Sequence, residues 1–385
     1  MRQNLVGLGV GATLIVGLFV AACSSSGSSS GAGSSGSSSG SSGCGGGSSG
    51  SADGGGPGAA GALPATTFLY LSAVASDRDV VIAYDRASGE ARTITDLRGD
   101  GSQGWGIRGY SLSPDRTRIA IASLYGPTKE DVDTKLAANR IWTFAVDGSD
   151  FRRLTPVWKN TGAGRKDFVI EVTDPVFSKD GETVFFEYGE YWYEGTNLQG
   201  AAGIWRAGAA GGALPELFQA PSPCSLVSPS VDPSTGKVAI IHSVCVPGQG
   251  QQDGIYLYDE NGGGTPEVLL ARSNQVDVML EQPRWAADGS GFVFIAQTPI
   301  QDGSSTRQVR SLFVFDMKTR EATPVVVPEK PDTRVIDATV APDVSAIVYC
   351  LQEGDARNLH LIDLSGDQAT DTAITNDGTS CHPVW

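Results

Sequence analysis

The sequence contains Pro175-Val176-Phe177-Ser178-Lys179-Asp180-Gly181, which leads into the apolar run Thr183-Val184-Phe185-Phe186. Serine, proline, aspartate and glycine supply the geometry of a tight turn, and the β-branched and aromatic residues on either side favour strands. This segment therefore predicts two antiparallel strands joined by a tight turn.

Copies of this segment recur along the chain. The large apolar residue of each copy is separated from the next by roughly 45 to 65 residues, a period at or just above that of propeller blades. A second hairpin follows most copies, as in Ile141 to Leu154, so each repeat carries the four strands of one blade. The copies begin at Tyr110, Pro175, Pro229, Pro283, Ala338 and His382, and their large apolar residues are Leu112, Phe177, Val231, Trp285, Val340 and Trp385.

The two ends of the repeat region complement each other. Thr67 to Leu71, Val80 to Tyr84 and Ala91 to Thr95 match the last three strands of a blade, and His382 to Trp385 matches the missing first strand. Pairing the two ends closes the ring and removes exposed strand edges. We therefore predict an all-β domain over residues 64–385, a six-bladed β-propeller closed by pairing of its N- and C-terminal strands. The other five blades are predicted at 106–156, 171–219, 224–271, 279–327 and 335–377.

The repeats resemble those of TolB-like six-bladed propellers, which have the pattern Pro-x-Trp-Ser-Pro-Asp-Gly. Pro175 to Gly181, Pro283 to Gly289 and Ser111 to Asp115 carry the resemblance, which extends over the whole repeat region. It implies the fold and, by analogy, a partner in the cell envelope such as a peptidoglycan-associated lipoprotein. TolB has a further α/β domain ahead of its propeller, whereas this chain has a Ser/Gly-rich segment there.

The N-terminus has the three parts of a secretory signal, namely a charged start, an apolar segment and small residues before a cysteine. Val20-Ala21-Ala22-Cys23 resembles the bacterial lipobox, whose cysteine becomes the lipidated first residue. We predict a signal peptide over residues 1–22 and lipidation at Cys23. The alternative is an uncleaved anchor helix from Leu5 to Ala22, near the lower length limit for spanning a bilayer. Both versions export the chain and tether it to a membrane of the bacterial cell envelope, and we expect the outer membrane.

A flexible linker follows the lipid cysteine. Residues 23–63 are nearly all Ser, Gly and Ala, a composition that cannot form a core, so we predict disorder. About 40 such residues have a root-mean-square span on the order of 35 Å, which lets the propeller stand away from the lipid surface.

The charge balance excludes one class of partner. The chain has 28 Lys+Arg against 43 Asp+Glu, a formal charge of -15. Nucleic-acid binding needs a basic surface, so we expect no nucleic-acid partner. We interpret the acidity as a solubilising surface and expect a monomer.

The cysteines indicate an oxidising compartment. Cys224 and Cys245 flank the first hairpin of the fourth blade, and Cys350 and Cys381 fall on adjacent blades at the ring closure. We predict the disulfides Cys224–Cys245 and Cys350–Cys381, with free buried thiols as the alternative. No Cys-x-x-Cys spacing suggests a metal cluster.

The sequence offers little for catalysis. His242, His360 and His382 are the only histidines, and we interpret them as core or channel residues rather than metal ligands or general bases. No Gly-x-Ser-x-Gly motif of a hydrolase occurs in the repeat region, residues 64–385, and we expect no cluster of carboxylates in the channel. Glu130, Asp131 and Asp133 lack the pattern of a calcium loop. We therefore predict no catalytic residue, no metal and no cofactor.

One face of the propeller is predicted to carry long loops. The connections between second and third strands and between blades open on one face, and here they are long, as in Glu187 to Gly203 and Gln297 to Ser311. Aromatic and arginine side chains dominate binding surfaces, so those on this face are candidates. The alternative is that these side chains fold back and cap the loops. The candidates are Trp105, Trp158, Tyr188, Tyr191, Trp192, Tyr193, Arg307 and Arg310.

These patterns together predict a lipid-anchored envelope propeller that binds a protein or a glycan through its long-loop face. The enzyme alternative is a polysaccharide lyase or glycosidase that uses the central channel. A third possibility is a passive stabiliser of the envelope.

Overall fold

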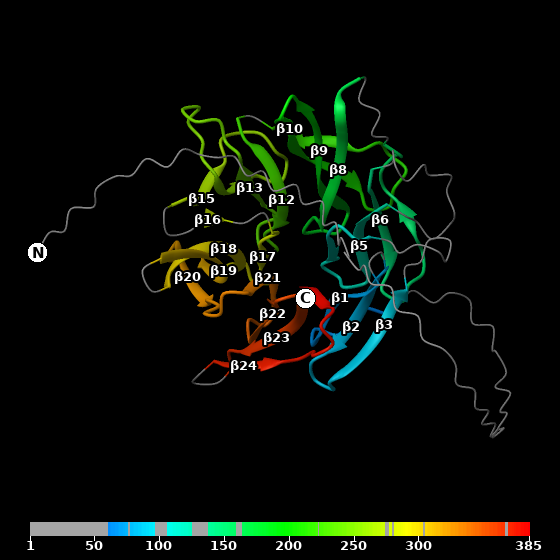
Figure 1. The fold of residues 1–385 in the computed structure, drawn as a ribbon. Coiled ribbons are helices and arrows are strands. Elements are labelled where there is room, and N and C mark those ends of the chain that lie inside the picture. Colours follow the sequence, from blue (N-terminus) through cyan, green and yellow to red (C-terminus); the bar gives the residue numbers. More distant parts are fainter. Residues whose placement is uncertain are drawn as a thin grey trace, which may run out of the picture. The chain divides into compact units, whose positions relative to one another are not determined.

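The structure is a computed structural model, and it describes residues 61–75, 78–96, 106–124, 138–158, 164–221, 223–273, 277–278, 281–302, 305–365 and 369–385. All helical or extended elements that the structure describes within these ranges are β-strands; none is a helix. The strands form six antiparallel sheets set in a ring (Figure 1). The prediction of a six-bladed, all-β propeller is confirmed.

Each sheet is one blade, and its strands follow one another from the channel outward. The first three blades are β25 (Ser380–Val384), β1 (Thr67–Ala75), β2 (Arg78–Asp85) and β3 (Glu90–Asp96); β4 (Tyr110–Leu112), β5 (Arg118–Ser123), β6 (Arg140–Ala145) and β7 (Arg152–Arg153); and β8 (Lys166–Phe177), β9 (Thr183–Glu194), β10 (Asn197–Gly208) and β11 (Glu216–Gln219).

The remaining blades repeat this order, except that β16 and β17 both pair with β18. They are β12 (Ser225–Val231), β13 (Val238–Ser243), β14 (Gly254–Tyr258) and β15 (Glu267–Ala271); β16 (Asp277–Val278), β17 (Arg284–Trp285), β18 (Gly291–Asp302), β19 (Ser305–Asp316) and β20 (Glu321–Val326); and β21 (Thr333–Val340), β22 (Ala346–Glu353), β23 (Ala356–Asp363) and β24 (Thr370–Ala373).

The turn between β8 and β9 shows why the repeated segment has its composition. Ser178 Oγ donates to Asp180 Oδ1 at 2.6 Å, and the Glu182 amide donates to the same oxygen at 3.0 Å. The Thr183 amide donates to Ser178 Oγ at 2.9 Å. Gly181 has φ +76°, which favours glycine. Serine, aspartate and glycine thus satisfy and shape the turn locally, as the sequence predicts.

The apolar core lies between neighbouring blades. Phe68 and Tyr70 of β1 pack in one cluster with Val348 and Cys350 of β22, which joins the first blade to the sixth. Ala120 of β5 likewise packs with the third blade. Each sheet therefore buries both faces against its neighbours, and the stability of a blade depends on the adjacent blades.

The ring closes as the sequence predicts. β25 pairs with β1, with Leu69 opposite Val384 and Leu71 opposite Cys381. Trp385 Nε1 also donates to the Ala65 carbonyl at 2.6 Å. The first blade is thus assembled from both ends of the propeller, and its innermost strand comes from the C-terminal end.

Both predicted disulfides are present, Cys224–Cys245 and Cys350–Cys381. The second joins β22 of the sixth blade to β25 of the first. It therefore cross-links the closing strand to the neighbouring blade, in addition to the hydrogen bonds between β25 and β1.

Leu63, which the sequence places at the end of the linker, is the first buried residue of the described part of the chain. Leu63 is buried in the core between the first two blades. Arg116, which lies in the turn before β5, donates to the carbonyl oxygens of Leu63, Pro64 and Thr67. The predicted signal peptide, Cys23 and the rest of the linker lie outside the described residues. No helix suited to crossing a bilayer occurs in the part of the chain that the structure describes.

Replacing both Cys350 and Cys381 with serine is expected to lower the free energy of unfolding by about 3 kcal/mol. The two cysteines are 31 residues apart, and losing the cross-link restores chain entropy to the unfolded state. Urea unfolding of parent and variant at one pH measures the difference. An unchanged unfolding midpoint would show that strand pairing alone holds the closure.

Candidate functional site

A ring of six residues surrounds the central channel, one from each blade. Each stands three positions before the large apolar residue of its repeat. The six are Gly109, Asp174, Ser228, Gln282, Asp337 and His382.

A break in strand pairing occurs at most of these positions. The register between the two inner strands shifts around Asp174, Ser228, Asp337 and His382. Asp174, Ser228 and His382 have φ values of 51°, 50° and 53°, in the left-handed region. Such β-bulges redirect side chains and are common beside functional sites.

Five of the six ring residues line a cavity of about 210 Å³; Ser228 does not. The lining comes from the innermost strands of blades one, two, three, five and six, from the residues just before two of these strands, and from Leu71 of β1, so the cavity lies in the channel. The complete set is Leu71, Ile107, Arg108, Gly109, Tyr110, Asp174, Glu281, Gln282, Arg284, Asp337 and His382.

The prediction that the channel lacks clustered carboxylates is wrong. Asp174, Glu281 and Asp337 line the cavity, and Glu187 is buried beside Asp174. These residues come from β8, β9, β21 and the segment before β17. Sequence spacing did not reveal them as a cluster because only the ring geometry brings them together.

Burial raises the pKa values of these carboxyl groups. Asp174 keeps partial contact with the cavity but lies deep in the protein, and burial raises its pKa to about 6. Ser228 Oγ, which donates to Asp174 Oδ2 at 2.9 Å, and the Arg284 charge both oppose this rise. Burial, followed by the charge of Asp174, raises the pKa of Glu187 well above its usual range. Burial therefore disfavours ionisation of both carboxyl groups at once.

Arginine and histidine side chains face the carboxylates. Arg310 forms an ion pair with Glu281 and donates to the Ile336 carbonyl at 3.1 Å. Arg284 donates to the Tyr110 carbonyl at 3.4 Å. His382 Nδ1 lies 3.4 Å from Asp337 Oδ2. The cavity thus offers both charges and can bind polar groups of either sign. A cavity with a strongly perturbed carboxyl group is a candidate functional site.

Three of the predicted binding-face aromatics fold back onto the core. The Trp158 and Tyr188 rings lie 4.9 Å apart, and Tyr188 also lies 5.3 Å from Trp205. Tyr191 packs against the core that blades three, four and five share. For these residues the structure favours the alternative in which the side chains cap their own loops.

Trp192 and Tyr193 lie near the outer end of the hairpin formed by β9 and β10, and both are partly exposed. The Arg165 guanidinium lies 4.0 Å from the Trp192 ring centre, a cation–π contact. Trp192 Nε1 also donates to Glu194 at 3.2 Å. These two aromatics remain candidates for contact with a partner.

The two predicted arginines have different surroundings. Arg307 donates to the carbonyl oxygens of Pro328 and Glu329 at the edge of the fifth blade, whereas Arg310 lies in the channel cluster. Trp105 lies outside the described residues. The structure thus separates one candidate set into core, hairpin and channel groups.

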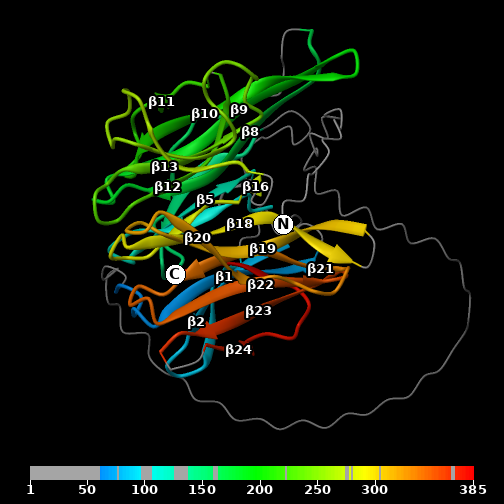
Figure 2. The ribbon, with the colours of Figure 1, turned by 90° about the vertical axis from the view of Figure 1, so that its left-hand side faces the viewer.

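The expected long loops at Glu187 to Gly203 and Gln297 to Ser311 are mostly strand. β9 and β10 pair from Thr183 to Gly208, and β18 and β19 pair from Gly291 to Asp316. The aromatic and β-branched residues of these segments favour strand over loop. Both hairpins extend on the same side of the ring (Figure 2), so the prediction of one elaborated face holds for these two blades.

The hairpins lead into the channel cluster. β8 (Lys166–Phe177), which pairs with β9, carries Asp174 of the channel cluster, and Arg310 of the same cluster lies on β19. We call the exposed ends of the two hairpins, together with the cavity, the hairpin face. The sequence did contain a signal for the ring residues around the channel. In four of the six repeats the ring residue is polar and stands directly before a proline: Asp174, Ser228, Gln282 and His382.

Three solved structures show the breadth of this fold. TolB from Acinetobacter baumannii matches with a TM-score of 0.56 and 15% identity over 83% of this chain and 66% of that chain. Hydrazine synthase from Kuenenia stuttgartiensis matches with a TM-score of 0.53 and 12% identity over 83% of this chain and 46% of that chain. A chain of a nidogen/laminin complex matches with a TM-score of 0.50 and 9% identity over 83% of this chain and 97% of that chain.

At these identities the likeness shows the fold alone, a propeller shared by proteins of different functions. This chain also spans less than two thirds of the TolB chain. No family model matches the sequence, and no curated protein matches it.

Replacing Asp174 with asparagine is expected to make stability less dependent on pH between about 4 and 6. A raised pKa means that the folded state binds the proton more tightly than the unfolded state, so the parent loses stability as pH rises through this window. Asparagine does not titrate, and the variant therefore gains stability relative to the parent. Denaturant unfolding at several pH values measures the difference.

Asp180→Asn is the matched control on the same blade. Hydrogen bonds from Ser178 and the Glu182 amide lower the pKa of this exposed carboxyl, so its variant should lose stability relative to the parent as pH rises. Parallel pH profiles for the parent and Asp174→Asn would contradict the assignment.

Proposed function

We propose that this chain is an exported, lipid-anchored propeller that binds a component of the bacterial cell envelope through its hairpin face. The observation that carries this proposal is the mixed-charge channel cluster at the base of two protruding hairpins. Buried polar groups that face a cavity recognise a complementary ligand, and partly exposed aromatics beside them add contact area.

The partner class rests on analogy. The resemblance of the repeats to those of TolB-like propellers favours an envelope protein, such as a peptidoglycan-associated lipoprotein, over a small molecule. A glycan is the second partner class, because Trp192 and Tyr193 offer aromatic surfaces for stacking. The propeller itself has no need of a cofactor for either role.

The cellular location follows from the N-terminus and the cysteines. Lipidation at Cys23 would hold the chain on the outer membrane, on its periplasmic side or at the cell surface. The disulfides Cys224–Cys245 and Cys350–Cys381 support an oxidising compartment. The linker would let the propeller search for partners at a distance from the lipid.

One observation favours a second candidate function. Burial raises the pKa values of Asp174 and Glu187, and Arg284 lies in the cavity that Asp174 lines. A carboxyl group of this kind can act as a general acid or base. A polysaccharide lyase or glycosidase that uses the channel is therefore the enzyme alternative.

Capture from envelope extract tests the hairpin face. The purified full chain is compared with a Trp192→Ala/Tyr193→Ala variant and with Leu214→Ala. Leu214 lies after β10 and is 82% exposed, which makes it a matched control away from the hairpin ends. We expect the parent and Leu214→Ala to capture the same partner. The double variant should bind that purified partner at least about tenfold more weakly, because aromatic hot spots dominate interfaces.

A channel variant extends the same experiment. Arg310→Met removes the ion pair with Glu281 and should also weaken binding if the partner reaches the cavity. Equal affinity for the parent, the hairpin variant and Arg310→Met would overturn the hairpin face as the binding surface. Turnover of an envelope polysaccharide that Asp174→Asn abolishes would instead support the enzyme alternative.

Replacing Cys23 with alanine tests the anchor. Without the lipid-bearing cysteine, the chain is expected to move from the detergent-soluble membrane fraction to the soluble extracytoplasmic fraction or to remain unprocessed. Cell fractionation and mass spectrometry of the N-terminus measure both outcomes. A parent chain that keeps residues 1–22 and stays membrane-bound would favour the uncleaved anchor helix.

A further inference from the structure

The Cys224–Cys245 disulfide has a histidine beside it. The two sulfur atoms and a ring nitrogen of His242 all lie within 4.8 Å of one another. His242 is 1% exposed, and its Nδ1 atom makes no hydrogen bond of normal geometry among the residues that the structure describes, although the Gln251 side chain lies close enough to interact with the ring. Buried polar atoms without partners are rare and call for an explanation.

Neighbouring side chains hold the ring in one orientation. His242 Nε2 lies 2.8 Å from the hydroxyl oxygen of Tyr258, and the ring stacks on Tyr256 with 3.8 Å between centres. When Nε2 donates its proton to the tyrosine oxygen, Nδ1 carries a free lone pair. Metal-binding histidines are oriented by such a contact from their other nitrogen.

We propose that reduction of the Cys224–Cys245 disulfide creates a zinc site whose protein ligands are Cys224, Cys245 and His242. Two thiolates and a neutral imidazole are ligands that Zn²⁺ prefers. The site is separate from the hairpin face and does not depend on the proposed function.

The conversion balances as a thiol–disulfide exchange followed by metal binding. A dithiol reductant supplies two electrons and two protons, its own sulfurs form a disulfide, and Cys224 and Cys245 become thiols. Zn²⁺ then displaces the two thiol protons, which pass to solvent. The redox state of the compartment thereby decides whether the metal binds.

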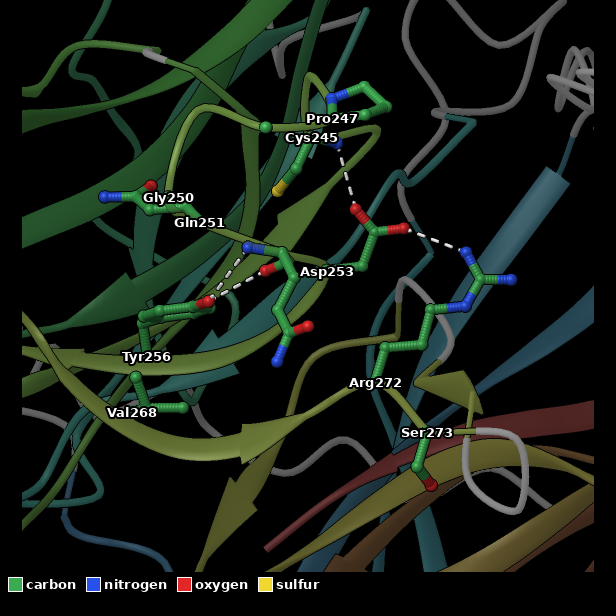
Figure 3. Close-up of a pocket in the computed structure, with 11 residues that line it drawn as sticks. Cys245, Pro247, Gly250, Gln251, Asp253, Tyr256, Val268, Arg272 and Ser273 are labelled. Carbon is green, nitrogen blue, oxygen red and sulfur yellow. Dashed lines mark hydrogen bonds and ion pairs between the residues drawn. The ribbon is translucent and has the colours of Figure 1, made fainter.

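A pocket gives solvent access to the site. A hollow of about 690 Å³ is lined by Cys245, Gln251 and Asp253, among others (Figure 3). Asp253 accepts the Cys245 amide at 2.9 Å and pairs with Arg272 at 3.1 Å, so its oxygens already have partners. The fourth position of a tetrahedral zinc ion is left to a water molecule from this pocket, as in zinc sites with three protein ligands.

The other disulfide provides an internal control. Among the described residues, no histidine or carboxylate forms a comparable ligand group with Cys350 and Cys381. Reduction of that bond should therefore create no site of this kind. The difference between the two disulfides is the buried histidine.

Metal titration of the full chain in both redox states tests the proposal. The chain is reduced with a phosphine, in a Cys44→Ser background to remove the linker thiol, and titrated with Co²⁺ and Zn²⁺. We expect one equivalent of metal and a thiolate-to-cobalt charge-transfer band in the reduced chain alone. His242→Gln should weaken zinc binding at least about tenfold. Mutation of a residue that only supports a metal ligand lowers metal affinity by about that much, and loss of the ligand itself should lower it at least as much. Cys350→Ser/Cys381→Ser should bind as the parent does.

Circular dichroism of each reduced chain checks that the fold persists. The absence of the charge-transfer band from a folded, reduced parent would overturn the proposal. Equal zinc affinity in the parent and His242→Gln would do the same, as would metal binding that the Cys350→Ser/Cys381→Ser variant loses.

Discussion

The pairing of β25 with β1 is the constraint on which the rest of the molecule depends. A row of sheets that each bury both faces leaves two unpaired ends unless the first and last blades meet. Here the first blade takes its innermost strand from the C-terminal end, and a disulfide from the sixth blade holds that strand. The inner strands then converge on one axis, so that residues 109, 174, 282, 337 and 382 can line one cavity.

Closure also explains how charge reaches the interior. An inner strand that continued in regular pairing would present its side chains to the neighbouring blades. The register shifts at Asp174, Ser228, Asp337 and His382 interrupt that pattern. The resulting cluster is costly because burial disfavours carboxylate charge, as the raised pKa of Asp174 shows. Buried carboxyl groups with strongly shifted pKa values are characteristic of binding and catalytic sites.

The fold was predictable because its signals are local and repeated. Ser178, Asp180 and Gly181 form their turn with one another, and turns of this kind recur at intervals of roughly 45 to 65 residues. The closing strand and both cysteine pairs followed from the position of each residue within its repeat. Local turn chemistry and the repeat period were therefore enough to predict the propeller and both disulfides.

The site was less predictable because its members meet only in three dimensions. Asp174, Glu281 and Asp337 are far apart in sequence and come from different blades, so no spacing links them. The aromatic candidates show the opposite difficulty. Tyr188 and Trp192 lie in one run of aromatic residues, yet Tyr188 stacks on Trp158 and Trp205 whereas Trp192 stays partly exposed. The two residues are four positions apart on β9, so strand alternation places both on the same face. Position along the strand distinguishes them, because Trp192 lies nearer the end of the β9–β10 hairpin, and a segment expected to be a loop does not reveal this position.

The entry of the chain into the propeller has a mechanical consequence. Arg116 donates hydrogen bonds to three carbonyl oxygens between Leu63 and Thr67, and β1, which follows, lies between β25 and β2. A force applied from the N-terminal side would first act on the hydrogen bonds of Arg116. It would then have to shear the β1–β25 and β1–β2 hydrogen bonds at the same time. A propeller pulled from this side would therefore resist unfolding far better than a hairpin whose hydrogen bonds break one at a time.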